Sequence, residues 1–125
     1  MREIKFRGWH TVKGIMFSAE TMAEDQLTLL PTGQFINVHS DSTRLSQVYP
    51  ADKFIPLQFT GLKDKNGKEI YEGDIVKQFG NPILMVVSFI NSMFALGRWN
   101  LSGFDAQAIE VIGNIYENPE LLEAH

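Results

Sequence analysis

Residues 58–76 constrain the fold of this chain more than any other segment, because they encode two turns and two strand starts. Asn66-Gly67 supplies backbone positions that accept a positive φ angle, and apolar residues flank it, so this dipeptide predicts the tip of a tight hairpin. Glu72-Gly73-Asp74 predicts a second turn, which leads into the β-branched strand start Ile75-Val76. The structural turn residues are therefore Asn66, Gly67, Gly73 and Asp74, and Gly73 is expected to hold φ above zero.

The first half of the chain predicts short antiparallel strands. Apolar and polar residues alternate over residues 4–9, which is the period-two pattern of a half-buried strand. Residues 11–14 can turn that strand back into residues 15–17, so a hairpin is expected here. Two further strands are predicted at residues 26–30 and 34–39, with a turn at residues 31–33. Residues 18–25 fit either a loop or one helical turn, and residues 44–49 are too short to classify.

The second half continues the same pattern. Residues 54–60 have the composition of a strand, but Pro56 cannot donate a hydrogen bond, so this strand is expected at a sheet edge or with a bulge. Residues 83–90 are an apolar, β-branched run that predicts a strand buried on both faces. Asn91-Ser92 predicts a turn into its hairpin partner, residues 93–99, and residues 109–112 predict a final strand. Asn118-Pro119-Glu120 is the start signal of a short C-terminal helix.

These elements predict a mainly β protein whose second half forms a small antiparallel barrel. The expected organisation is an N-terminal β-hairpin region over residues 1–57 and a barrel region over residues 58–125, which could also form one compact unit. A chain of 125 residues is long enough to bury a core of its own.

The composition is that of an ordinary soluble globular protein, with 44% hydrophobic and 21% charged residues. There are 0 cysteines, which removes disulfides and thiolate metal sites and fits a reducing compartment. Charged residues interrupt the first ten positions, so no signal peptide is expected, and the longest apolar run is far shorter than the roughly 20 residues of a membrane helix. The expected location is the cytoplasm, without membrane contact.

The residues present exclude or disfavour most kinds of catalytic site. No two of the three histidines have metal-ligand spacing; they are His10, His39 and His125. The run of residues 64–67 superficially resembles a calcium loop, but its glycine stands fourth instead of sixth, so a hairpin turn is expected. Three carboxylates, Glu69, Glu72 and Asp74, could pair as acid and base or hold Mg²⁺, although turn and packing roles explain them better. We therefore expect no enzyme activity, catalytic residue, metal or cofactor.

Binding to another macromolecule is the remaining class of function, and the partner we expect is an unidentified protein. The candidate interaction surface consists of Trp9, Phe54, Pro56 and Trp99, because tryptophan and strand edges are common at interfaces. The strand of residues 54–60 offers an edge on which a second copy of the chain could pack, which predicts a homo-oligomer.

The alternative is a nucleic-acid-associated protein. Two basic sets could make local contacts with a phosphate backbone: Arg2, Lys5, Arg7 and Lys13, and Lys63, Lys65 and Lys68. With 15 acidic against 11 basic side chains, the formal charge of -4 opposes such binding without removing it from consideration.

Three blocks of this sequence resemble the YopX family of small phage and prophage proteins: residues 4–9, 58–76 and 111–122. Family members usually carry Ala at the position of Gly8 and Asp at that of His10, and both departures are expected to lie in a turn. The resemblance implies a β-rich protein with an SH3-like barrel in its C-terminal part and an uncharacterised biochemical function. It supplies no catalytic residues to carry over.

Overall fold

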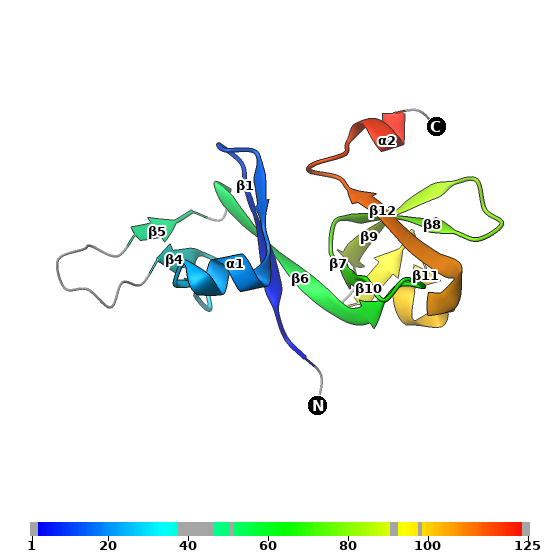
Figure 1. The fold of residues 1–125 in the computed structure, drawn as a ribbon, viewed down its shortest axis with the longest axis horizontal. Helices are drawn as coiled ribbons and strands as arrows, with labels where there is room; N and C mark the ends of the chain where they lie inside the picture. Colours follow the sequence, from blue (N-terminus) through cyan, green and yellow to red (C-terminus); the bar gives the residue numbers. More distant parts are fainter. Residues whose placement is uncertain (1–2, 38–46, 51, 91–92, 98, 124–125) are drawn as a thin grey trace. The chain divides into compact units, whose positions relative to one another are not determined.

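The computed structural model of the protein describes residues 3–37, 47–50, 52–90, 93–97 and 99–123. The chain forms two compact units. We call Lys5–Leu57 the N-terminal unit, and Gln58–His125 together with Met1–Ile4 the C-terminal unit. Both are built from short antiparallel strands with few short helices, so the prediction of a mainly β protein is confirmed (Figure 1).

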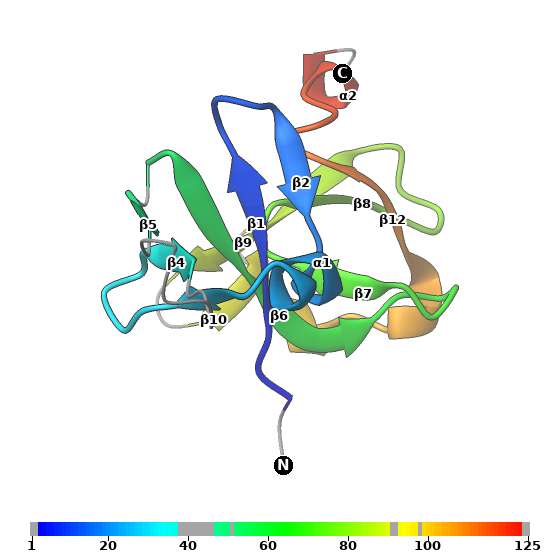
Figure 2. The same cartoon turned by 60° about the vertical axis from the view of Figure 1, so that its left-hand side comes forward.

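The N-terminal unit begins with the predicted hairpin. Its elements are β1 (Phe6–His10), β2 (Ile15–Phe17), α1 (Ala19–Glu24), β3 (Leu27–Leu29), β4 (Phe35–Asn37), β5 (Gln47–Tyr49) and the first part of β6 (Phe54–Lys63). Strands β1 and β2 run side by side, with Gly8 opposite Phe17 (Figure 2). Residues 18–25, which fit either a loop or one helical turn from sequence, contain the helix α1. The Ser18 side chain caps this helix by accepting a hydrogen bond from the Thr21 N–H.

Phe54 is the centre of the core of the N-terminal unit. Its side chain is 1% exposed, and its ring packs against those of Phe35 and Phe17 with centroid separations of 4.7 and 5.2 Å. His10 and Tyr49 complete the aromatic cluster at 5.3 and 5.4 Å from the same ring. The expectation that Phe54 lies at an interaction surface is therefore wrong, because its ring is buried in the core of the unit.

Gly8 lies inside β1, not in the expected turn, and the Phe54 ring explains why it is glycine. A methyl group at Gly8 would lie 2.9 Å from Phe54 Cδ1 and 3.1 Å from Met22 Sδ, with Phe54 Cε1 closer still. The space of its Cβ atom is already filled by this buried ring. His10 likewise lies in β1, where its Nδ1 accepts a hydrogen bond from the Lys13 N–H.

We expect Gly8→Ala to lower the free energy of unfolding by about 1–2 kcal/mol, since it overpacks this core. Chemical denaturation followed by circular dichroism measures the loss. A Phe54→Leu background supplies the control, because the smaller side chain should accept the methyl group and reduce the cost of Gly8→Ala. An equal cost in both backgrounds would show that Phe54 is not the reason for the glycine.

The C-terminal unit contains a five-stranded antiparallel sheet and the hairpin formed by the end of β6 and the next strand. Its elements are the end of β6, β7 (Glu69–Tyr71), β8 (Asp74–Gln78), β9 (Leu84–Ile90), β10 (Met93–Leu96), β11 (Trp99–Asn100), two 3₁₀ turns η1 (Leu101–Gly103) and η2 (Ala106–Ala108), β12 (Ile109–Asn114) and α2 (Glu120–Glu123). The sheet order is β11-β10-β9-β8-β12, and it curls into half of a barrel (Figure 1). The predicted final strand and C-terminal helix are confirmed as β12 and α2.

The core of the C-terminal unit lies on one face of this sheet. Buried side chains come from nearly every strand: Ile70, Val76, Val87, Leu96, Leu101, Ile109 and Val111. The strand predicted at residues 83–90 is confirmed as β9, and Met93 pairs with Ile90 across the predicted hairpin. Its tip, Asn91-Ser92, lies outside the described residues. The expected burial on both faces is wrong, because Ile83 and Phe89 are 65% and 52% exposed.

Strand β6 has two neighbours in the sheet order, β1 and β7. The pairing with β7 does not reach residues 54–58, the part of the strand that contains Pro56. Pro56, which has no backbone N–H to donate, is tolerated in β6 because β7 pairs only with the later residues of this strand, from Phe59 to Lys63. That pairing contains the irregularity, with Gly61 at φ +88°. Within the described part of the chain, no helix has the length and apolar character that crossing a membrane requires.

Candidate interaction site

The predicted hairpin at Asn66-Gly67 is confirmed between β6 and β7. Lys63 pairs with Glu69, so five residues form the turn. The Gly67 N–H donates to the Asp64 carbonyl at 3.0 Å, and Gly67 has φ +78°, which a side chain would disfavour. The predicted turn chemistry therefore places this glycine where a left-handed residue is required.

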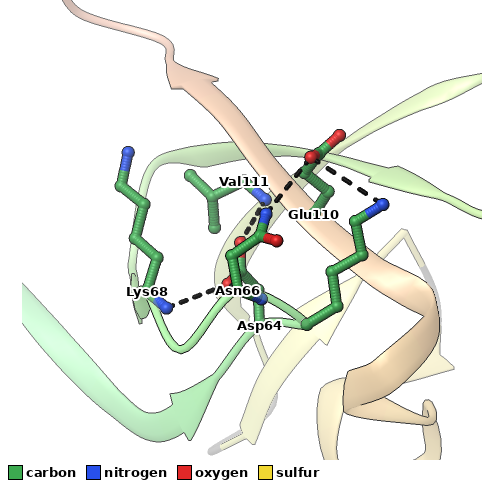
Figure 3. Close-up of polar contacts among 6 residues, drawn as sticks. Asp64, Asn66, Lys68, Glu110 and Val111 are labelled. Carbon is green, nitrogen blue, oxygen red and sulfur yellow. Dashed lines mark hydrogen bonds and ion pairs between the residues drawn. The ribbon is translucent and has the colours of Figure 1, made fainter.

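A buried carboxylate holds that turn against β12. Asp64 is 4% exposed; its Oδ1 accepts from the N–H groups of Asn66 and Lys68 at 2.9 Å, and its Oδ2 accepts from the Val111 N–H at 2.9 Å (Figure 3). Burial acts to raise the pKa of this carboxyl, but the hydrogen bonds from Val111, Lys68 and Asn66 outweigh it, and the pKa lies below its ordinary value. Asp64 thus joins residues 47 positions apart.

The outer side of the same turn carries a weaker contact with β12. Asn66 Nδ2 donates to Glu110 Oε2 at 3.2 Å, and Lys65 Nζ lies 3.8 Å from the same oxygen (Figure 3). Both Lys65 and Glu110 are more than a third exposed, so this ion pair contributes little to stability. The ion pair places the positive charge of Lys65 next to the carboxylate of Glu110.

Gly73 has φ +89°, as its sequence context predicts. Its N–H donates to the Val87 carbonyl at 2.8 Å, and its carbonyl accepts from the Ile115 N–H at 2.9 Å. Asp74 is 1% exposed, and its Oδ2 accepts from the Tyr71 N–H at 2.7 Å. This turn therefore connects three segments of the C-terminal unit.

The three neighbouring carboxylates have separate hydrogen-bond donors. Glu69 accepts from the Tyr71 hydroxyl at 3.3 Å, Glu72 from the Gln58 N–H at 3.4 Å, and Asp74 from the backbone N–H of Tyr71. Among the described residues, no three His, Asp or Glu side chains lie close enough together to hold a metal ion.

The predicted interaction residues belong to different units, Trp9, Phe54 and Pro56 to the N-terminal one and Trp99 to the C-terminal one. Trp9 is half-buried in β1 opposite Met16, Phe54 is core, and Pro56 is half-buried in β6. Trp99 pairs with Leu96 through the backbone of β11, and its side chain lies outside the described residues.

Among the side chains that the structure describes, the most exposed large hydrophobic one is a residue that sequence reasoning missed. Phe79 is 85% exposed at the turn between β8 and β9, and Ile83 at the other end of that turn is 65% exposed. The backbone of the turn is nonetheless fixed, because the Phe79 N–H donates to the Ala108 carbonyl at 2.8 Å and the Ile83 N–H donates to Asn81 Oδ1 at 2.9 Å. The signal was available in the sequence as a phenylalanine directly before Gly80 in a turn.

Two hollows adjoin this turn. The larger has a volume of about 560 Å³ and is lined by Gln78, Asn81, Met85, Asn100, Gly103, Phe104 and Asp105. The smaller, of about 260 Å³, is lined by Lys65, Lys77, Phe79, Ala108 and Glu110. We call Phe79, Ile83 and the larger hollow the tip site.

The tip site combines apolar groups with fixed polar ones. Met85 and Phe104 are half-buried and pack against the core of the unit, so they form an apolar lining that does not move freely. The amide and carboxylate side chains around them can donate and accept hydrogen bonds. A hollow of this size and composition is suited to binding part of a ligand.

Comparison with known proteins gives a structural neighbour and a family. The crystal structure of protein EF1440 from Enterococcus faecalis is similar to this chain, with a TM-score of 0.67 and 26% sequence identity, and the match covers 98% of this chain and 99% of that one. A search of curated proteins finds no match. The model of the family described as YopX protein matches residues 5–123. Because this match spans nearly the whole fold just described, the chain belongs to the YopX family.

Proposed function

We propose that this YopX family member is a non-catalytic protein-interaction module that binds a polypeptide partner through the tip site. The observation that carries the proposal is Phe79, whose ring is 85% exposed on a turn with a fixed backbone. Burying a phenylalanine side chain contributes roughly 1.5–3 kcal/mol, so leaving it in water forgoes stability that a core position would give. An aromatic anchor on a rigid element is typical of an interface hot spot.

The surroundings of Phe79 support a polypeptide as the partner. Ile83 adds a second exposed apolar side chain to the same turn, and hollows adjoin the turn on the Gln78 and Lys77 sides. A partner could therefore cover the phenyl ring and insert side chains beside it, which is how interfaces exclude water around an anchor.

An SH3-like arrangement of the C-terminal unit is part of this proposal. The curled five-stranded sheet supports it, and small barrels of that kind often present peptide-binding surfaces, although this is an argument by analogy of fold. Phage or prophage origin, a cytoplasmic location and self-association stay predictions.

A nucleic acid is the second candidate partner, favoured by the smaller hollow. Lys65 and Lys77 line it together with the exposed Phe79 ring, and an aromatic group with cationic neighbours is suited to stacking on an unpaired base. Glu110 lines the same hollow and engages Lys65, so one of the two positive charges is offset, and the net charge of the whole chain is -4. We therefore place protein binding first.

Selection from a library of random displayed peptides tests the proposal with matched variants. We expect peptides selected on the parent protein to lose about 30-fold or more in affinity for Phe79→Ser, which corresponds to a hot-spot loss of about 2 kcal/mol. Val12→Ser is the control, because Val12 is 74% exposed in a turn of the N-terminal unit. Fluorescence polarisation measures each affinity.

Equal weakening by both substitutions, or no effect of Phe79→Ser, would contradict the proposal. Failure to enrich any peptide would count against it too. If instead the parent protein binds single-stranded DNA with a steep dependence on salt, and Phe79→Ser abolishes that binding, the nucleic-acid alternative is the better one.

A further inference from the structure

The polar groups of the larger hollow have a defined orientation. Asn81 Oδ1 accepts from the Ile83 N–H at 2.9 Å, and Asn100 Oδ1 accepts from the Ser102 N–H at 3.0 Å. Because a backbone N–H can only donate, these bonds decide which end of each amide is oxygen. The Nδ2 groups of Asn81 and Asn100 are thereby left as donors for a ligand.

Asp105 supplies the charge of this hollow. Its Oδ1 accepts from the Gln107 N–H at 2.9 Å, which fixes the carboxylate at the start of η2 and leaves Oδ2 as an acceptor. Of the described residues that line the hollow, Asp105 alone is charged. In a protein of net charge -4, a cation is the complementary group.

The apolar lining fits the rest of a basic side chain. Met85 and Phe104 line the hollow between the polar groups and the core. Lysine and arginine carry alkyl stems that pack on apolar surface while the charged head stays near water, and a cation also interacts favourably with an aromatic face. One side chain of this type would use the Asp105 charge and the apolar lining together.

We infer that the larger hollow receives a lysine or arginine side chain of the partner polypeptide, with Asp105 as its counter-charge. Asn81 and Asn100 donate from Nδ2 to backbone carbonyls of the same partner segment. This inference rests on the proposed function, since it specifies the partner that the tip site selects. It assigns the tip site two subsites, an apolar one at Phe79 and a cation-binding one at Asp105.

Nuclear magnetic resonance titrations of the full chain with capped tripeptides test the inference. The probes are N-acetyl-Ala-Arg-Ala-amide, its Lys counterpart, and Glu and Leu counterparts of the same length. We expect the Arg and Lys peptides to shift the side-chain amide signals of Asn81 and Asn100 with saturation in the millimolar range, and the Glu and Leu peptides to leave them in place. Equal shifts with all four peptides, or none with any, would overturn the inference.

Asp105→Asn is the informative variant, because the amide oxygen can still accept from Gln107 while the charge is lost. We expect it to weaken Arg-peptide binding about fivefold, the size expected of a partly exposed ion pair. Asp25→Asn, an equal change of charge in the N-terminal unit, should have no effect. An unchanged affinity in Asp105→Asn overturns the inference even if library peptides still depend on Phe79. Conversely, Arg-peptide binding with no effect of Phe79→Ser on library peptides would overturn the proposed function alone.

Discussion

Asp64→Ala is expected to lower the free energy of unfolding by about 3–5 kcal/mol, the largest loss of any single substitution considered. The change removes the acceptor of three backbone N–H groups, those of Asn66, Lys68 and Val111. A buried donor left without a partner costs about 1–3 kcal/mol. The hydrogen bond from the Val111 N–H is buried, and those from Asn66 and Lys68 are partly buried. The turn after β6 would lose its buried connection to β12 and keep the Lys65 N–H bond to the Ile109 carbonyl and the contacts with Glu110.

Equilibrium denaturation in urea measures this loss, with Asp105→Ala as the control. Asp105 also accepts a backbone N–H two residues along the chain, but it is exposed, so water can replace it. The control should lose about 1 kcal/mol or less, as expected of an exposed cap. Similar losses in both variants would mean that Asp64 acts only within its own turn.

The same carboxylate predicts how stability depends on pH. The pKa of Asp64 is lowered in the folded protein from its ordinary value of 3.8. A group with a depressed folded pKa stabilises the protein above its unfolded pKa, and this stability is lost as the pH falls through the folded value. As the pH falls below about 4, the advantage of the parent over Asp64→Ala in free energy of unfolding should therefore shrink. A difference in free energy of unfolding that stays constant with pH would contradict the assignment.

Gly73→Val is expected to have the second largest effect, about 3 kcal/mol. A non-glycine residue at φ +89° stores strain of about 1–3 kcal/mol, and the added Cβ would lie 3.2 Å from Tyr116 Cε2, a contact that adds overpacking. The backbone has little freedom to relieve either, because Gly73 is hydrogen-bonded to both Val87 and Ile115.

Two other glycines separate the causes of that loss. Gly67 also has a positive φ of +78° but nothing lies within 4 Å of its Cβ position, so Gly67→Val measures strain without crowding. Gly103 has neither feature, and Gly103→Val should be nearly neutral. Thermal unfolding should rank the losses as Gly73 above Gly67 above Gly103. A melting curve of Gly73→Val that overlays the parent would refute the role of this turn.

Turn chemistry made much of the fold predictable from sequence. Asn66-Gly67 and Gly73 were located correctly because a positive φ is a local requirement that glycine satisfies at little cost. The apolar run that became β9 was recognised for a similar reason, since β-branched residues favour strands wherever they are later placed.

The wrong or missing predictions concern contacts and exposure of side chains in the folded protein. Phe54 and Gly8 lie in different strands, so no local pattern indicates that a ring in one fills the Cβ space of the other. The bond between Asp64 and Val111 joins positions 47 residues apart and has no local pattern. Exposure of Phe79 was missed because hydrophobicity predicts burial only on average.

Chemical-shift mapping of the full chain with a library-selected peptide tests the tip site most directly. Binding at this site predicts that the largest backbone shifts fall within residues 78–85 and 99–105, which hold Phe79, Ile83 and the lining of the larger hollow. The N-terminal unit should shift little. Shifts concentrated in residues 5–57, or spread evenly over both units, would contradict the assignment of the tip site as the binding surface.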